Sequence, residues 1–289
     1  MNPADIAPYG ADTRAILYRK SAFAESGLDP EQPPTNWQDL VTMALRTVKR
    51  AGPDFERVGF NVPLTQFATG QQWVNFFYQQ GGDYFTEDFS RVLWNTEAGY
   101  LAAQFQADLV NKYQVCPLGG GGNLVRGTLA ISDGNSGVVL DARRNAPEVL
   151  LDLGFGMPLK EKRQMAFLGG NSLHITKQSK GAAESWILLR WLLTPGPLTV
   201  YGEITSTPTG RISVNRDAQY MRDTPLLQRF AEAGQYGRTV PTVPGDGQLS
   251  TILHTALESI IRGQVAPKAG LDAAADQANR ILEEARRSR

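Results

Sequence analysis

The feature that most constrains this chain is a pair of adjacent glycines inside an apolar stretch. Residues 166–175 read Ala-Phe-Leu-Gly-Gly-Asn-Ser-Leu-His-Ile, with apolar side chains on both sides of Gly169 and Gly170. The alternation of Leu173 and Ile175 with polar residues predicts a strand. Because glycine has no Cβ, the pair allows either a bulge in a core strand or a close approach of the backbone to a ligand. The local pattern leaves both interpretations open.

The rest of the chain alternates helical and extended patterns. Apolar residues recur with a helical spacing in several segments that end at glycine or proline. The predicted helices lie at 20–26, 35–48, 71–80, 96–113, 183–193, 249–261 and 271–282. Short apolar runs predict strands at 15–18, 58–62, 138–140 and 153–157. Alternation of this kind is typical of the α/β class rather than of a helical bundle or a β-sandwich.

The composition excludes several classes of partner. The 289 residues carry 29 basic and 29 acidic side chains with no long run of one sign, so we expect no obligate nucleic-acid partner. A single cysteine, Cys116, excludes an internal disulfide and a cysteine-rich zinc site. No apolar run reaches the ~20 residues that span a bilayer, and residues 1–6 lack the charged and apolar regions of an export signal. The length is enough for about two domains.

Residues able to carry chemistry are scattered along the sequence. The histidines, His174 and His254, are far apart and lack neighbours with metal-ligand spacing. Residues 134–137 fall one residue short of a G-x-S-x-G nucleophile motif, and the glycines at 119–122 lack the Gly-Lys-Ser/Thr of a phosphate-binding loop. We therefore expect no catalytic residue, no metal and no cofactor, and the sequence favours binding over catalysis.

Five segments form a recognisable series along the chain. Residues 8–20 contain Asp-Thr-Arg and Leu-Tyr-Arg-Lys, and residues 23–40 contain Gly-Leu-Asp-Pro followed by Pro-Pro-Thr-Asn-Trp. Residues 127–131, 167–175 and 186–194 continue the series. In this order they resemble the extracellular solute-binding proteins of ABC transporters, family 1, a sugar-binding group that is similar to maltose-binding protein. The 23–40 segment is the most specific match.

The resemblance implies a two-lobed, α/β periplasmic-binding-protein fold, type II-like, with an incomplete first lobe. The lobe is expected to be incomplete because family members carry a longer segment before the first crossing. On the family's topology, residues 1–14 are the first hinge crossing and residues 15–168 the second lobe. Residues 169–210 are then the return crossing and the rest of the first lobe. Residues 211–289 are C-terminal helices that pack mainly on the second lobe.

The same resemblance implies a function without chemistry. We expect the substrate-binding component of an ABC importer, located in the periplasm or at the cell surface, that captures a carbohydrate in the cleft between its lobes. Its partners would be the carbohydrate or polyol ligand and the permease subunits of the inner membrane. Two alternatives stay open: a ligand of the glycerol-3-phosphate type or another polyol, and a truncated remnant without a ligand.

The candidates for the ligand site begin at the two crossings. Gly169, Gly170 and Asn171 come first, because the glycines allow close approach of the backbone and the family uses this crossing. At the first crossing, Asp12 and Arg14 fit a polar contact in the cleft as well as they fit a salt bridge within the hinge.

The remaining candidates each have a competing structural interpretation. Trp73 occupies the region where relatives place a stacking aromatic residue, but its aromatic neighbours favour packing in the core equally. Asn135 and Ser136 lie where many sugar binders carry an aromatic residue, which this chain lacks. Arg238 resembles an arginine near the cleft of glycerol-phosphate-type relatives, although a surface position is the better interpretation.

Overall fold

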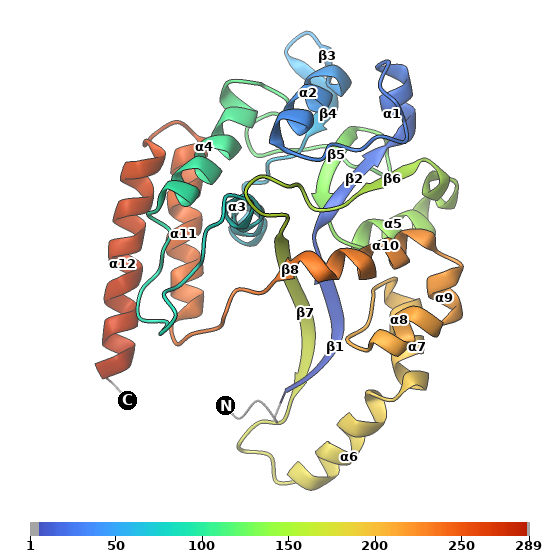
Figure 1. Cartoon of the computed structure of the whole chain (residues 1–289), viewed down its shortest axis with the longest axis vertical. Coiled ribbons are helices and arrows are strands. Elements are labelled where there is room, and N and C mark those ends of the chain that lie inside the picture. The colour runs from blue at the N-terminus through green and yellow to red at the C-terminus, as the bar shows by residue number, and fades with distance from the viewer. Residues whose placement is uncertain (1–5, 288–289) are drawn as a thin grey trace.

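The computed structural model describes residues 6–287, which form two β-sheets surrounded by helices (Figure 1). The larger sheet has the strand order β3-β4-β5-β2-β6, and the smaller has the order β1-β7-β8. Residues 1–5 of the predicted first crossing, and residues 288 and 289 of the predicted C-terminal segment, lie outside the described residues.

The elements have the following bounds. The strands are β1 (Ile6–Thr13), β2 (Ala15–Arg19), β3 (Lys49–Ala51), β4 (Asp54–Phe60), β5 (Leu129–Gly134), β6 (Leu153–Gly156), β7 (Ala166–His174) and β8 (Gly237–Arg238). The helices are α1 (Lys20–Glu25), α2 (Trp37–Thr47), α3 (Gln66–Gln79), α4 (Glu97–Asn111), α5 (Gly137–Asn145), α6 (Ala182–Leu192), α7 (Pro195–Thr205), α8 (Ile212–Asp217), α9 (Gln219–Arg222), α10 (Pro225–Ala233), α11 (Asp246–Ile261) and α12 (Pro267–Arg287).

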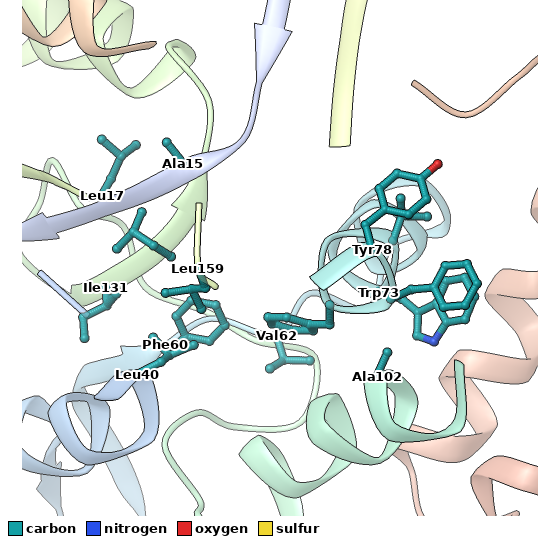
Figure 2. Packing of buried hydrophobic residues seen from close by; sticks show 14 of the residues in the cluster. Ala15, Leu17, Leu40, Phe60, Val62, Trp73, Tyr78, Ala102, Ile131 and Leu159 are labelled. Carbon is teal, nitrogen blue, oxygen red and sulfur yellow. The ribbon is translucent and has the colours of Figure 1, made fainter. Parts of the chain in front are cut away.

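The five-stranded sheet is built around β2. This strand pairs antiparallel with β5 on one side and with β6 on the other, and β4 extends the sheet parallel to β5. Side chains from the sheet and from α2 form a common core, in which Leu17, Leu40, Phe60 and Ile131 are fully buried (Figure 2). The strands predicted at 15–18, 58–62 and 153–157 are confirmed as β2, β4 and β6, with shifted ends.

Two adjacent crossing strands join the sheets. β1 leads into β2 with Arg14 as the intervening residue. β1 pairs antiparallel with β7, so that Asp12 lies opposite Gly169 and Ala11 opposite Gly170. In Figure 1, β1 and β7 run side by side from the larger sheet towards α6 and α7. The strand predicted at the glycine pair is therefore confirmed as β7.

The helices after β7 fall into two groups. Helices α7 to α10 contact one another, and α10 also contacts β1, whereas α11 and α12 pack against α4 and α11 also packs against α3. Within residues 6–287 no helix combines the length and the apolar character needed to cross a membrane. The division of the chain into lobes at residues 14, 168 and 210 stays a prediction.

One detail of the predicted secondary structure is wrong, and the helix after α6 was not predicted. Residues 138–140, predicted as a strand, lie in α5, because Val139 and Ala142 point inward with the spacing of a helix. A short apolar run does not by itself distinguish the two periods. The helix predicted at 183–193 does end before Pro195, as α6, but Pro195 is also the first residue of α7, which was not predicted. Proline suits that position because the first N–H of a helix has no intrahelical acceptor.

Helix α6 presents apolar side chains to solvent. Its one buried residue is Leu189, while Ile187, Leu188 and Trp191 are 70%, 55% and 58% exposed. Each exposed side chain forgoes roughly 1.5–3 kcal/mol of burial. Helix α11, by contrast, buries Leu249, Leu253, Leu257, Ile260 and Ile261. The two helices should therefore differ in local stability.

We expect limited proteolysis of the 289-residue chain to cut α6 before α11, and a hydrophobic dye to bind near Trp191. Ile187→Lys with Trp191→Lys should remove most of the dye signal and leave the unfolding midpoint nearly unchanged. The matched core change Leu257→Ala should cost about 2–5 kcal/mol. Equal resistance of both helices, in a monomer that binds no dye, would contradict this account.

Candidate functional site

A cleft of about 530 Å³, lined by polar and apolar side chains, opens where β7, α3, α5 and α7 meet. Its volume lies in the range of typical small-molecule sites. The crossing strands contribute Asp12, Phe167, Gly169, Gly170 and Asn171. The helices and their ends contribute Phe67, Gln71, Asn135, Ser136, Gly137, Leu140, Tyr201, Thr205 and Thr207. The cleft is thus assembled from segments that are far apart in the sequence.

Most of the predicted site residues meet in this cleft. The structure brings together Asp12, Asn135, Ser136, Gly169, Gly170 and Asn171. The pairing of β1 with β7 places Asp12 opposite Gly169, and β5 delivers Asn135 one residue beyond its end. Whether these residues contact a ligand stays a prediction.

The glycine pair has a packing reason of its own. A Cβ on Gly170 would lie 2.5 Å from the carbonyl oxygen of Gly10, and one on Gly169 would lie 2.9 Å from the Phe167 ring. The first contact is with backbone, which moves less easily than a side chain. Gly170 therefore allows β7 to lie close to β1, and it lines the cleft at the same time.

Arg14 lies outside the cleft lining and binds the carboxylate of Asp12. Its guanidinium donates to Asp12 Oδ1 at 3.0 Å and to Gln71 Oε1 at 2.5 Å. The Arg14 side chain is 12% exposed and the Asp12 side chain 30% exposed. Arg14 and Asp12 therefore form a salt bridge, and Asp12 also lines the cleft. The role of this pair in a hinge or in ligand binding stays a prediction.

Hydrogen bonds orient the other polar groups of the lining. Asn171 Nδ2 donates to the Tyr201 hydroxyl at 3.1 Å, which ties β7 to α7. The N–H of Gly137 donates to Asn135 Oδ1 at 3.1 Å. The Ser136 hydroxyl lies 3.5 Å from that of Thr207. These contacts hold hydroxyl and amide groups at the cleft surface in fixed directions.

Besides Arg14, two predicted site residues, Trp73 and Arg238, lie outside the cleft lining. Trp73 is fully buried in α3, where its indole N–H donates to the Gly99 carbonyl at 3.2 Å and its ring stacks on Phe77. Its assignment as a ligand-stacking residue is therefore wrong, because the core covers both its faces. Arg238 pairs with Asp83 and lies over the Tyr78 ring, outside the cleft lining, and its contact with a ligand stays a prediction.

The sequence analysis missed the aromatic residues of the cleft. Phe67 is 71% exposed and belongs to the first turn of α3, which begins before the predicted start of that helix. Phe67 and Gln71 are four residues apart and share one face of the helix, turned away from Trp73. Tyr201 was missed because no helix was predicted after residue 193, where α7 begins at Pro195. The four-residue spacing of Phe67 and Gln71 is the sequence signal that could have placed Phe67 on the same helix face as Gln71.

Behind the cleft, Asp133 has an unusual carboxyl group. It lies on β5 and accepts hydrogen bonds from Asn75 Nδ2 at 2.7 Å and from Gln72 Nε2 at 3.3 Å. Burial raises the pKa of Asp133 to about 6, against the opposing effects of Asn75, Arg14 and Gln72. Within residues 6–287 no group of three or more His, Cys, Asp or Glu side chains is arranged to hold a metal ion.

The two sheets, the paired crossing strands and the cleft beside them form an α/β fold of the two-lobed periplasmic-binding-protein type. The chain belongs to the bacterial extracellular solute-binding protein family, which it matches over residues 3–228. The predicted family resemblance and the α/β fold class are thereby confirmed, and the relatives named below are binding proteins. An incomplete first lobe stays a prediction.

Similar proteins include binding proteins for different solutes. UgpB of Salmonella typhimurium, an sn-glycerol-3-phosphate-binding periplasmic protein, is 22% identical over 95% of this chain and 66% of its own. The probable amino-acid ABC transporter periplasmic-binding protein y4oP of Sinorhizobium fredii is 24% identical over 75% of this chain and 50% of its own. The chain thus spans between half and two thirds of the length of these relatives.

Solved structures show the same fold. A solute-binding protein from Thermotoga lettingae, bound with α-D-tagatose, superposes with a TM-score of 0.82 at 23% identity. A cyclic α-maltosyl-1,6-maltose binding protein from Arthrobacter globiformis gives the same TM-score and identity. The match covers 96% and 97% of this chain, respectively, and 72% of each structure.

We expect Gly170→Val to lower the unfolding midpoint, because its side chain would collide with the Gly10 carbonyl and separate β1 from β7. Asn171→Ala, one residue away, leaves the sheet intact and should change the midpoint little. Thermal unfolding of both variants by circular dichroism tests the assignment. A Gly170→Val protein as stable as the parent would show that the strands can separate at no cost.

The burial of Asp133 should make the stability depend on pH with a definite sign. Between pH 4 and pH 6 the folded chain holds this proton and the unfolded chain does not, so this residue's contribution to stability falls as the pH rises. Above the folded pKa the penalty is constant at roughly 3 kcal/mol. Asp133→Asn should lack the slope, and urea unfolding from pH 4 to pH 8 measures the difference between the two proteins. Parallel stability curves would contradict the assignment.

Proposed function

We propose that the chain is the substrate-binding component of an ABC importer and captures a carbohydrate in the cleft without changing it chemically. The observation that carries the ligand class is the lining, which combines the exposed Phe67 ring with hydroxyl- and amide-bearing residues such as Thr207 and Asn171. Sugars offer C–H faces that pack on aromatic rings and hydroxyls that hydrogen-bond to fixed polar groups.

The charge of the lining favours a neutral ligand over a phosphorylated one. Among the lining residues that the structure describes, Asp12 alone is charged at neutral pH. The nearby cation, Arg14, already donates to Asp12 and Gln71. The Gly137 N–H at the start of α5 is taken by Asn135. Phosphate is usually bound by Arg, Lys or free helix N–H groups, so the lining supports a neutral carbohydrate or polyol despite the UgpB relatives.

The family supports the remaining parts of the proposal. An extracellular solute-binding protein hands its ligand to membrane-embedded partners, which we take to be ABC permease subunits of the inner membrane. The corresponding location is the periplasm or the cell surface. The glycerol-3-phosphate relatives make that ligand the second candidate.

A thermal-shift comparison of maltose, mannobiose, D-tagatose and glycerol 3-phosphate tests the proposal. A sugar that binds should stabilise the protein by about 2.7 kcal/mol at a hundredfold excess over Kd, and chromatography should return it unchanged. Stabilisation by glycerol 3-phosphate alone would favour the second candidate. No stabilisation by any sugar, or turnover of one, would overturn the proposal.

Two variants locate the site. Phe67→Ala should weaken sugar binding roughly tenfold through the lost ring contact, and Asp12→Asn by tenfold or more through the lost charge-assisted hydrogen bond. The matched control is Phe89→Ala, which removes another exposed aromatic residue that lies outside the cleft lining. Titration calorimetry that shows equal affinity for the Phe67 variant and the parent would place the ligand elsewhere.

A further inference from the structure

One guanidinium group holds two side chains of the cleft. Arg14 lies outside the lining, yet it donates from Nη1 to Asp12 Oδ1 at 3.0 Å and from Nη2 to Gln71 Oε1 at 2.5 Å. Arg14 is itself fixed, because its backbone N–H donates to the Phe167 carbonyl at 3.2 Å and its side chain is 12% exposed. A guanidinium is planar and presents its N–H groups in a rigid fork. One group therefore sets the positions of Asp12 and Gln71 relative to each other.

The contact with Arg14 also fixes the direction of the Gln71 amide. A guanidinium can only donate, so the carbonyl oxygen of Gln71 must turn towards it. The NH₂ group is the other end of the amide, and within residues 6–287 it donates to no protein group. Since Gln71 lines the cleft and Arg14 does not, these two N–H donors are left for the cleft.

Asp12 presents the opposite chemistry. Its Oδ1 accepts from Arg14, and within the described part of the chain no protein group donates to its Oδ2. A Cβ on Gly169 would lie 3.7 Å from Oδ2, so this oxygen lies beside the strand that lines the cleft. An ionised carboxylate only accepts. The cleft therefore carries an acceptor from β1 and a donor from α3, both held by the same arginine.

Phe67 adds an apolar surface beside the donor. It precedes Gln71 by four residues on α3, so the two side chains are neighbours on one face of the helix, and Phe67 is 71% exposed. A sugar that packs a C–H face on an aromatic ring keeps its hydroxyls at the rim of that contact. Each hydroxyl can donate as well as accept, so two hydroxyls on adjacent carbons match Asp12 and Gln71 together.

Other polar groups match only half of this arrangement. An ammonium group only donates, so it would suit Asp12 but face the N–H groups of Gln71. A phosphate oxygen that accepts would suit Gln71 but face the carboxylate of Asp12. Asp12 and Gln71 together thus select ligand groups that can both donate and accept, which is the property of a hydroxyl.

We propose that Asp12 and Gln71 are a specificity pair for two adjacent hydroxyls of the sugar. Asp12 Oδ2 accepts from one hydroxyl, Gln71 Nε2 donates to its neighbour, and Phe67 packs on the sugar ring. Arg14 is a positioning residue, since it holds both members of the pair without touching the ligand. The inference rests on the proposed carbohydrate function and goes further, because it states which ligand groups are recognised and by which side chains.

Gln71→Glu tests the pair with a nearly isosteric change. The new carboxylate keeps an oxygen for Arg14 and replaces the free donor by an acceptor. Titration calorimetry uses whichever of maltose, mannobiose and D-tagatose binds, together with its monodeoxy analogues. In the parent, loss of the hydroxyl that contacts Gln71 should weaken binding about tenfold. Gln71→Glu should bind the full sugar about tenfold more weakly, and loss of the same hydroxyl should then cost it less than about twofold.

The matched control makes the same substitution away from the cleft. Gln248→Glu lies on an exposed position of α11 and should reproduce every affinity of the parent. If the penalty for each missing hydroxyl were the same in the parent and in Gln71→Glu, the pair would be overturned. Parent-like affinity of Gln71→Glu for the full sugar would overturn it as well.

Arg14→Lys separates positioning from support of the fold. Lysine keeps the positive charge but lacks the fork that holds two oxygens in fixed directions. With a circular dichroism spectrum like that of the parent, the variant should lose the penalty at the two recognised hydroxyls and keep the penalties at the others. A uniform loss of affinity for all analogues would overturn the positioning role of Arg14. If Arg14→Lys does not fold, the Gln71→Glu comparison decides.

The outcomes distinguish this inference from the proposed function. A parent that binds a sugar, but has no hydroxyl whose penalty depends on residue 71, keeps its function and loses the specificity pair. A parent that binds none of the three sugars loses the proposed function, and the pair is overturned with it.

Discussion

The pairing of β1 with β7 is the interaction on which the rest of this structure depends. Backbone hydrogen bonds between the strands bring Asp12 to Gly169 across a sequence separation that local contacts cannot bridge. They also set the distance at which the strands pass, which is so short that Gly170 must lack a side chain. One register therefore determines both the connection between the sheets and the main wall of the cleft.

Helix α3 serves three environments at once. Trp73 packs in the core, Phe67 and Gln71 face the cleft, and Gln72 and Asn75 lie in a buried polar layer against β5 and β7. The helical period distributes these roles around a single element. Buried amides are costly unless all their groups are paired, so the polar layer specifies how α3 sits against the crossing strands. The position of α3 against the crossing strands therefore helps to determine the shape of the cleft.

The sequence was sufficient for features that depend on local pattern. Strand β2, helix α11 and the strand at the glycine pair followed from apolar spacing. Four residues of the cleft followed from the crossings identified by resemblance, and Asn135 and Ser136 followed from the position of an aromatic residue in similar proteins. The errors have tertiary causes. Whether Trp73 faces a ligand or the core depends on which neighbours cover it, and spacing alone cannot give that. The short apolar run at 138–140 is compatible with a strand as well as with a helix, and its packing in α5 decides in favour of the helix.

The single residue between β1 and β2 has a mechanical consequence. A joint of one residue, Arg14, offers two soft backbone torsions, and its side chain is held by Asp12 and Gln71. A longer connector has more backbone torsions, and these could accommodate a rotation of one sheet without moving the other. Here the strands are stiff up to the joint, so a twist applied at either end is transmitted rather than dissipated. Arg14 is held at this point by its side-chain contacts with Asp12 and Gln71 and by its N–H, which donates to the Phe167 carbonyl at 3.2 Å. These contacts restrict the rotation of one sheet relative to the other.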